Sequence, residues 1–381
     1  MGRSVGRGWR LGAVGPVVVG LVLALVAPVG AGPVDPAPGL EVTTTVLPLL
    51  DVEGIEPNGN AHDVNDRGQV VGQSSFQPVL WQRGEVIQLM ESDPVLGGSA
   101  VQINDRGQVL VRSDRRLYLW FRGRVTELHG SPDATSFTGR HLNERGQVLG
   151  GYSPGDGGRD VSGVWETDGT FVPILPPDGY DVAVADLSDN GYVAGTLTSR
   201  DGSVRRPFLW RHGRFAWIGE SGISAAVNQR GQVVGIRADA ETGPFGVAVL
   251  WYRGEEVPLG LPAGDLPTPI SNAVDINDRG QVIGITALSS QETMAYRWDD
   301  GELVDLGTAG GPPIAPTRIN ERGQVVGFFQ VGNELRDFFW DRGDLVELGH
   351  GLGPDALNDR GQAVGNTVVD GLSRPVLWTV H

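Results

Sequence analysis

One segment of this sequence occurs eight times, in the form N-x-x-G-Q-V-V-G or a close variant of it. The first copy, NDRGQVVG, begins at Asn65, and the copy that departs most, SDNGYVAG, begins at Ser188. All eight copies share the glycine at the fourth position, and successive glycines are 38 to 49 residues apart: Gly68, Gly107, Gly146, Gly191, Gly231, Gly280, Gly323 and Gly361. A unit of about forty residues at this spacing predicts a repeat fold, in which each unit is one supersecondary structure.

The repeated segment has the composition of a tight β-hairpin turn. Asparagine at the first position of a type I turn bonds the backbone two residues further on. Glycine at the fourth position takes the left-handed conformation that closes a three-residue hairpin with a bulge. Ser188 replaces asparagine with another residue favoured at that place. The spacing D-x-[DN]-x-[DN]-G of a calcium loop is missing, so we interpret the segment as a structural turn.

A second signature in each copy is a run of apolar residues that ends in tryptophan, followed in all but the last copy by a glycine turn. The glycine placement predicts a second hairpin turn of the same kind as the first. The tryptophans are Trp81, Trp120, Trp165, Trp210, Trp251, Trp298, Trp340 and Trp378. They could form a ring of sugar-stacking platforms, but their place at the end of a strand favours burial between neighbouring sheets.

Two hairpin turns and the loop between them divide a complete copy into four short strands. The sixth copy shows them as SNAVDIN, QVIGIT, AYRW and ELVDLG. A four-stranded antiparallel unit of this size is a propeller blade, whereas stacked parallel coils do not need two tight turns. The last copy lacks its fourth strand, and the segment Val42–Leu50 is a spare strand. The sequence thus predicts one all-β domain, residues 42–381, an eight-bladed β-propeller closed by pairing of this N-terminal strand with the last blade.

The N-terminal region has the layout of an export signal. Met1–Arg10 is basic and Leu11–Val29 is apolar, and small residues follow. We predict a signal peptide over residues 1–31, a Pro-rich lead-in over residues 32–41 and a secreted, extracellular protein. The alternative is anchoring by an uncleaved N-terminal segment. With no cysteine in the chain, disulfides and thiolate metal sites are excluded.

The charge of the chain excludes two classes of partner. Without residues 1–31, 27 basic residues stand against 46 acidic ones, a net charge of −19. Such a surface repels nucleic acid and anionic membranes. We expect a soluble monomer that binds neither nucleic acid nor, after signal cleavage, a membrane.

The repeat resembles the extracellular HAF repeat family, whose units pair an N-x-x-G-Q-hydrophobic-hydrophobic-G segment with a His-Ala-Phe-like strand, a tryptophan and a glycine turn. The resemblance covers Asn60 to His381. Its first half matches well, while the half that names the family reads QPVLW, RPFLW or FFW here and contains no His-Ala-Phe. The resemblance implies an exported repeat protein and carries no catalytic residues over to this chain.

Motifs that carry chemistry are missing from the sequence. The six histidines show neither H-x-H nor H-E-x-x-H spacing, and no serine stands in G-x-S-x-G. No glycine-rich nucleotide-binding string follows a strand and opens a helix. We therefore predict no catalytic residue, no metal site and no cofactor, and we favour a non-enzymatic protein.

Longer loops predict which face of the ring binds a partner. The first and third turns of each blade share one face and are short, whereas the other connections share the opposite face and vary in length, as in Gly151–Asp160 and Thr196–Arg206. The candidate binding residues in and beside these loops are Tyr152, Arg159, Asp160, Tyr180, Arg200, Asp201, Arg205 and Arg206. We expect a binding or scaffolding module for an extracellular glycan or protein. The alternatives are a secreted hydrolase or lyase acting on polysaccharide with carboxylates near the central channel, and a purely structural surface protein.

Overall fold

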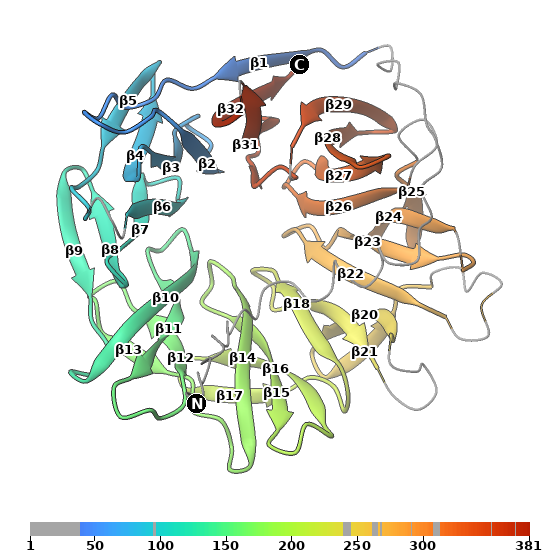
Figure 1. The fold of residues 1–381 in the computed structure, drawn as a ribbon. Coiled ribbons are helices and arrows are strands. Elements are labelled where there is room, and N and C mark those ends of the chain that lie inside the picture. Colours follow the sequence, from blue (N-terminus) through green and yellow to red (C-terminus); the bar gives the residue numbers. More distant parts are fainter. Residues whose placement is uncertain are drawn as a thin grey trace, which may run out of the picture.

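The computed structural model describes residues 39–93, 97–238, 245–260, 266, 269–290, 292–307, 313–351, 353–369 and 371–381. The expected signal peptide, residues 1–31, lies outside the described residues, as does most of the lead-in. Every regular element of the described residues is a β-strand. The 32 strands form eight four-stranded antiparallel sheets, arranged as blades around a ring (Figure 1). The predicted eight-bladed propeller is confirmed.

The strands of each blade follow one another from the centre of the ring outward. The first four blades are β2 (Gly59–Val64), β3 (Val70–Ser74), β4 (Gln77–Gln82), β5 (Glu85–Gln88); β6 (Gly98–Ile103), β7 (Gln108–Ser113), β8 (Arg116–Phe121), β9 (Arg124–Leu128); β10 (Ala134–Leu142), β11 (Val148–Pro154), β12 (Val161–Trp165), β13 (Phe171–Pro173); and β14 (Tyr180–Leu187), β15 (Val193–Ser199), β16 (Arg205–Arg211), β17 (Arg214–Trp217). The last four are β18 (Ile223–Val227), β19 (Val233–Arg237), β20 (Val247–Tyr252), β21 (Glu255–Pro258); β22 (Ser271–Ile276), β23 (Val282–Ala287), β24 (Thr293–Asp299), β25 (Glu302–Asp305); β26 (Ile314–Ile319), β27 (Val325–Val331), β28 (Glu334–Asp341), β29 (Asp344–His350); and β30 (Ala356–Leu357), β31 (Gln362–Val369), β32 (Leu372–Val380), β1 (Val42–Val46). The described residues contain no helix of the length and apolarity that a membrane crossing requires.

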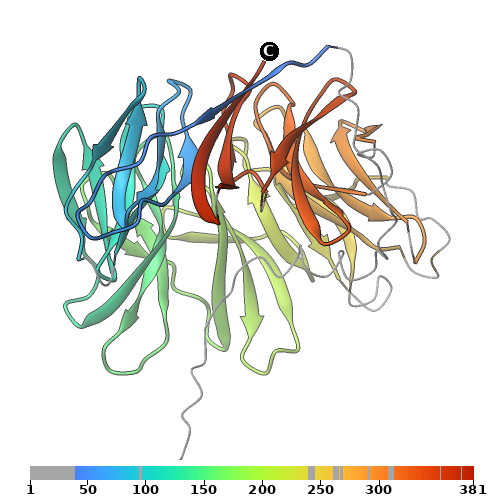
Figure 2. The same cartoon turned by 45° about the horizontal axis from the view of Figure 1, so that its top comes forward.

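The ring closes where the first strand joins the last blade. Strand β1 pairs antiparallel with β32, from Val42 opposite Val380 to Val46 opposite Val376 (Figures 1 and 2). Pro48 lies beyond the end of β1, where its missing N–H costs no ladder hydrogen bond. The predicted closure is therefore confirmed, and it removes the open edge that β32 would otherwise present.

The turn between the first two strands of each blade has the predicted geometry. In the first blade the Asn65 side chain accepts hydrogen bonds from the backbone N–H of Arg67 and Gln69, at 3.1 and 3.0 Å. Gly68 has a φ of +71°, the left-handed conformation that glycine adopts without steric cost. All eight turn glycines have positive φ.

The turn after the tryptophan differs from the prediction. In six blades it is a two-residue turn, because the residue before it pairs directly with the residue after it, as Gln82 does with Glu85. Both central residues are left-handed, with φ of +54° at Arg83 and +80° at Gly84, which defines a type I′ turn. Only the third blade has the predicted three-residue turn, closed by Gly169. The extra residue in its WETDG segment makes the difference.

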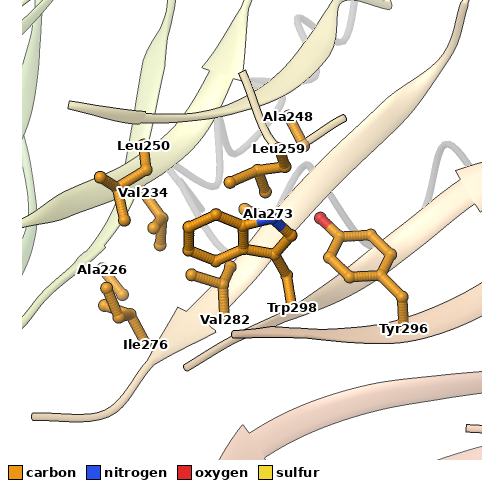
Figure 3. Packing of buried hydrophobic residues seen from close by; sticks show 10 residues of the cluster. All are labelled: Ala226, Val234, Ala248, Leu250, Leu259, Ala273, Ile276, Val282, Tyr296 and Trp298. Carbon is orange, nitrogen blue, oxygen red and sulfur yellow. The ribbon is translucent and has the colours of Figure 1, made fainter. Parts of the chain in front are cut away.

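The core of the molecule lies between adjacent blades. Trp298 of the sixth blade packs on Val234 and Leu250 of the fifth, and only 8% of its surface is exposed (Figure 3). Seven of the eight strand-end tryptophans are buried in this way, and Trp120 is half-buried. The interpretation of these side chains as packing residues is confirmed, so they do not form a sugar-binding ring.

Asparagine side chains link one blade to the next. The side-chain amide of Asn65 donates to the backbone carbonyl of Asn104 at 3.0 Å, and that of Asn358 donates back to Asn65 at 2.9 Å. Corresponding bonds occur at seven of the eight junctions. The exception is the junction after the fourth blade, because Ser188 is too short to reach the next turn. There Asn190 donates to the carbonyl of Gln229 instead, at 2.9 Å.

Candidate functional site

An exposed aromatic cluster lies on the fourth blade, at the face that carries the longer loops. Trp217, at the end of β17, is 46% exposed, unlike the eight tryptophans that recur once in each repeat. The ring of Tyr180, the first residue of β14, meets it edge-on with centroids 6.1 Å apart. The Arg206 guanidinium stands over the indole, 5.5 Å from its centroid. We call these three residues the aromatic platform.

The platform combines an apolar surface with hydrogen-bonding groups. Arg206 also pairs with the exposed Glu220 at 3.3 Å, while its Nε is buried without a partner. Sequence reasoning selected Tyr180 and Arg206 but missed Trp217. The signal was present, because Trp217 is the only tryptophan after residue 31 that does not precede a turn glycine or end the last repeat. Its position on an outermost strand, which leaves it exposed, appears only in the fold.

The other candidate residues surround the platform or have structural roles. Arg159 forms an ion pair with Asp181, which follows Tyr180 in β14. Asp160 accepts a hydrogen bond from Ser153 at 2.6 Å. Asp201 accepts hydrogen bonds from serine hydroxyls and from a backbone N–H of the same loop. These bonds lower the pKa of the Asp201 carboxyl to about 2. Asp201 therefore shapes its loop.

Several candidate residues expected in loops belong to strands. Tyr152 lies in β11, where its ring packs edge-on against Phe171 with centroids 5.3 Å apart. Arg205 and Arg206 begin β16, so the loop between β15 and β16 is shorter than expected and Arg200 is its first residue. The hairpins of the third and fourth blades extend further than the sequence indicated, because Gly, Ser and Thr mark loops and also fit strands. Arg200 and Arg205 are exposed on this face.

A ring of carboxylates lies on the opposite face, and sequence reasoning assigned it no role. At seven of the eight turns, the residue in the second position accepts a hydrogen bond from the backbone N–H of the same position in the preceding blade, as Asp105 does from Asp66 at 2.7 Å. Seven turns contribute a carboxylate: Asp66, Asp105, Glu144, Asp189, Asp278, Glu321 and Asp359. Burial and repulsion by neighbouring carboxylates raise the pKa of Glu144, Asp189, Glu321 and Asp359 above their usual range. These contacts give the ring a role in holding the blades together.

Acidic residues also line the inner strands of the ring. Asp63 accepts backbone N–H bonds from Val64 at 2.9 Å and from Ile103 of the next blade at 2.8 Å. Burial raises the pKa of Asp63 to about 7 and, with repulsion from Asp186, that of Asp275 to about 6. The positive charge of Arg318, from another blade, opposes both shifts. The inner wall is therefore polar. Within the described residues no group of three or more His, Asp or Glu side chains is arranged to hold a metal ion.

Comparison with known proteins identifies the fold alone. No family model matches the chain, and a search of the curated proteins finds no match. A solved structure from a study of two prolyl endopeptidases superposes with a TM-score of 0.52 at 12% identity, over 72% of this chain and 49% of that one. The chain thus spans about half the length of that protein.

Two further solved structures are similar. The β-propeller domain of the Trilobed protease from Pyrococcus furiosus, which has an open velcro topology, gives a TM-score of 0.50 at 11% identity over 84% of this chain and 93% of that one. Dipeptidyl peptidase 4 from Porphyromonas gingivalis gives 0.52 at 9% identity, over 85% and 59%. The chain belongs to the β-propeller class. Within that class it is an eight-bladed repeat protein whose ring is closed by its own first strand.

Proposed function

We propose that this protein is a secreted, non-enzymatic HAF-type repeat protein that binds an extracellular glycan on its loop-bearing face. The observation that carries the proposal is the aromatic platform. An indole exposed over 46% of its surface costs free energy in water, and burying it against a ligand recovers that cost. The flat apolar face of a sugar ring fits an indole, and Arg206 and Tyr180 offer hydrogen bonds to hydroxyl groups.

The fold supports a binding role in a second way. The recurring residues of the repeat are occupied by structure: asparagine and glycine form the turns, glutamine bonds the asparagine, and tryptophan fills the core. The groups left to meet a ligand stand at non-repeating positions. They lie on the loops and strand ends of the third and fourth blades, where a rigid scaffold holds them.

A glycan-binding assay tests the proposal. The secreted chain is screened against an array of oligosaccharides, and the strongest ligand is titrated by calorimetry. We expect Trp217→Ala to weaken binding at least tenfold, because it removes the apolar contact surface. Phe76→Ala is the control, since Phe76 is an equally exposed aromatic residue on a loop-face hairpin of the first blade. Equal affinities for the two variants would refute the platform.

The second candidate function is a hydrolase or lyase that uses the inner-wall carboxylates. The raised pKa of Asp63 and Asp275 favours it, because a carboxyl that keeps its proton near neutral pH can act as a general acid. Both oxygens of each carboxylate, however, already accept backbone N–H bonds. Release of reducing ends or unsaturated sugars from polysaccharide, lost in the variant Asp63→Asn, would establish this activity in place of simple binding.

A further inference from the structure

A cavity of about 460 Å³ lies between the second and third blades, on the loop-bearing face. One wall is the tip of the hairpin between β7 and β8, with Asp114 and Arg115. The other wall comprises Ser131 in the connection from β9 to β10, and Thr135 and Phe137 in β10. The volume falls within the range of about 300–1,000 Å³ that small-molecule sites occupy.

The backbone holds both walls in place. Asp114 and Arg115 form a two-residue type I′ turn, with φ of +52° and +63°. The N–H of Phe137 donates to the carbonyl of Arg115 at 3.0 Å, which fixes the hairpin tip on the third blade. Phe137 itself is anchored by the rings of Tyr152 and Trp165, with centroids 6.3 and 6.4 Å away. A left-handed arginine is a strained choice, since asparagine and glycine are the residues that this turn prefers.

The polar groups of the cavity are not all used within the protein. Arg116 is paired with Glu127, but the Arg115 guanidinium has no hydrogen bond or ion pair among the described residues. One carboxylate oxygen of Asp114 is buried without a hydrogen-bond partner. The hydroxyls of Ser131 and Thr135 donate to neighbouring residues and keep their acceptor capacity.

This set of groups selects for one kind of ligand. The Asp114 carboxylate would repel a net anion, and the Arg115 guanidinium would repel a net cation. A neutral ligand with many hydroxyls satisfies both, because each hydroxyl donates one hydrogen bond and accepts others. Since water takes ~30 Å³ per molecule, the cavity holds roughly fifteen waters, enough for the roughly twelve non-hydrogen atoms of a hexose.

We infer that the cavity between the second and third blades binds one neutral sugar residue, with Asp114 and Arg115 bonding its hydroxyls and Phe137 against its apolar face. The inference rests on the proposed glycan-binding function for its ligand class. It places a second contact next to the aromatic platform, on the other side of the third blade. A glycan chain that crosses the third blade would occupy both.

Monosaccharide titration tests this site separately from the platform. Glucose, galactose, mannose and N-acetylglucosamine are titrated by saturation-transfer NMR, with glucuronate and free glycine as charged probes. We expect a neutral sugar to bind and Asp114→Asn and Arg115→Gln each to weaken it at least tenfold. Arg83→Gln is the control, because Arg83 is also an exposed, left-handed arginine but lies on the opposite face.

The variant Arg115→Gly separates binding from stability. Glycine relieves the left-handed strain, so the melting temperature should rise while sugar binding is lost. Tighter binding of glucuronate or glycine than of every neutral sugar would overturn the inference, as would unchanged sugar affinity in Arg115→Gln. If cavity variants have no effect while Trp217→Ala still weakens oligosaccharide binding, the cavity site is wrong and the proposed function stands. If Trp217→Ala has no effect but the cavity variants do, the platform is wrong and the cavity stands.

Discussion

The asparagine that begins each repeat should be the most sensitive polar position in the molecule, and Asn320 tests this. Its side-chain amide donates to the backbone carbonyl of Asn358 in the next blade at 2.8 Å and to the Gln324 side chain at 2.7 Å. Its carbonyl oxygen accepts from the backbone N–H groups of Arg322 and Gln324, both at 3.0 Å. The side chain is buried, so water cannot replace these partners.

The expected magnitude follows from these four hydrogen bonds. Each contributes ~1 kcal/mol net, and the buried groups left unsatisfied add a desolvation cost, so Asn320→Ala should lower the free energy of unfolding by at least about 4 kcal/mol. The hydroxyl of Ser188, at the same position in the fourth blade, makes hydrogen bonds only to the backbone of Tyr192 within its own turn, at 3.1 and 3.5 Å. Ser188→Ala should therefore cost about 1 kcal/mol.

Urea unfolding followed by tryptophan fluorescence measures both variants. The buried tryptophans report on the interfaces between blades, and a shift in midpoint at constant slope isolates the stability change. If Asn320→Ala and Ser188→Ala differ by less than about 1 kcal/mol, a precision that such extrapolation allows, the inter-blade bond has little weight and the reasoning fails. The conversion Ser188→Asn should raise stability if the added amide reaches the carbonyl of Asn228.

Three further predictions concern closure, pH and the core. The backbone N–H groups of Glu41 and Leu47 donate to the C-terminal segment that β1 pairs with. By the alternation of an antiparallel ladder, the backbone N–H of Thr45 therefore points toward β32 and that of Thr44 points away from it. Because proline removes this N–H, Thr45→Pro should lower the melting temperature clearly more than Thr44→Pro. Because burial raises the pKa of Asp63 to about 7 and of Asp275 to about 6, the folded state binds these protons more tightly than the unfolded chain. The stability that these two protonated carboxyls contribute is complete below about pH 4 and is lost as the pH rises to about 7. The melting temperature should therefore be higher at about pH 5 than at about pH 8. The double variant Asp63→Asn, Asp275→Asn should reduce this difference. Trp298→Ala should cost ~3–5 kcal/mol by opening a cavity between the fifth and sixth blades, whereas Trp217→Ala should change stability by less than about 1 kcal/mol, as denaturant midpoints will show.

Features set by local interactions were predictable from the sequence. The turn at Asn65 forms from residues that are neighbours in the chain, so its type and its left-handed glycine followed from composition. The turn at Arg83 was predicted wrongly, because type I′ turns favour Asn, Asp or Gly at the first central position and this chain uses arginine. There the pairing of the flanking strands overrides the local preference.

The individual polar contacts between blades were not predictable. Asp66 binds the backbone N–H of Asp359, which is adjacent to it only once the ring has closed. Nothing in the local sequence assigns that carboxylate a partner. The same holds for the candidate sites. Trp217 and Tyr180 are far apart in the chain, and Asp114 and Phe137 line the same cavity from two neighbouring blades. A repeat pattern predicts what every blade shares, whereas a binding site depends on the residues in which one blade differs from the others.

Hydrogen–deuterium exchange of the secreted chain, with and without its strongest glycan ligand, tests the binding proposal most directly. The proposal predicts slower exchange in two regions of the loop-bearing face, residues 113–137 and residues 175–220, and no change in the turns that carry the carboxylate ring. Protection confined to those turns or to the inner strands would contradict it. That pattern would move the site to the opposite face or to the centre of the ring.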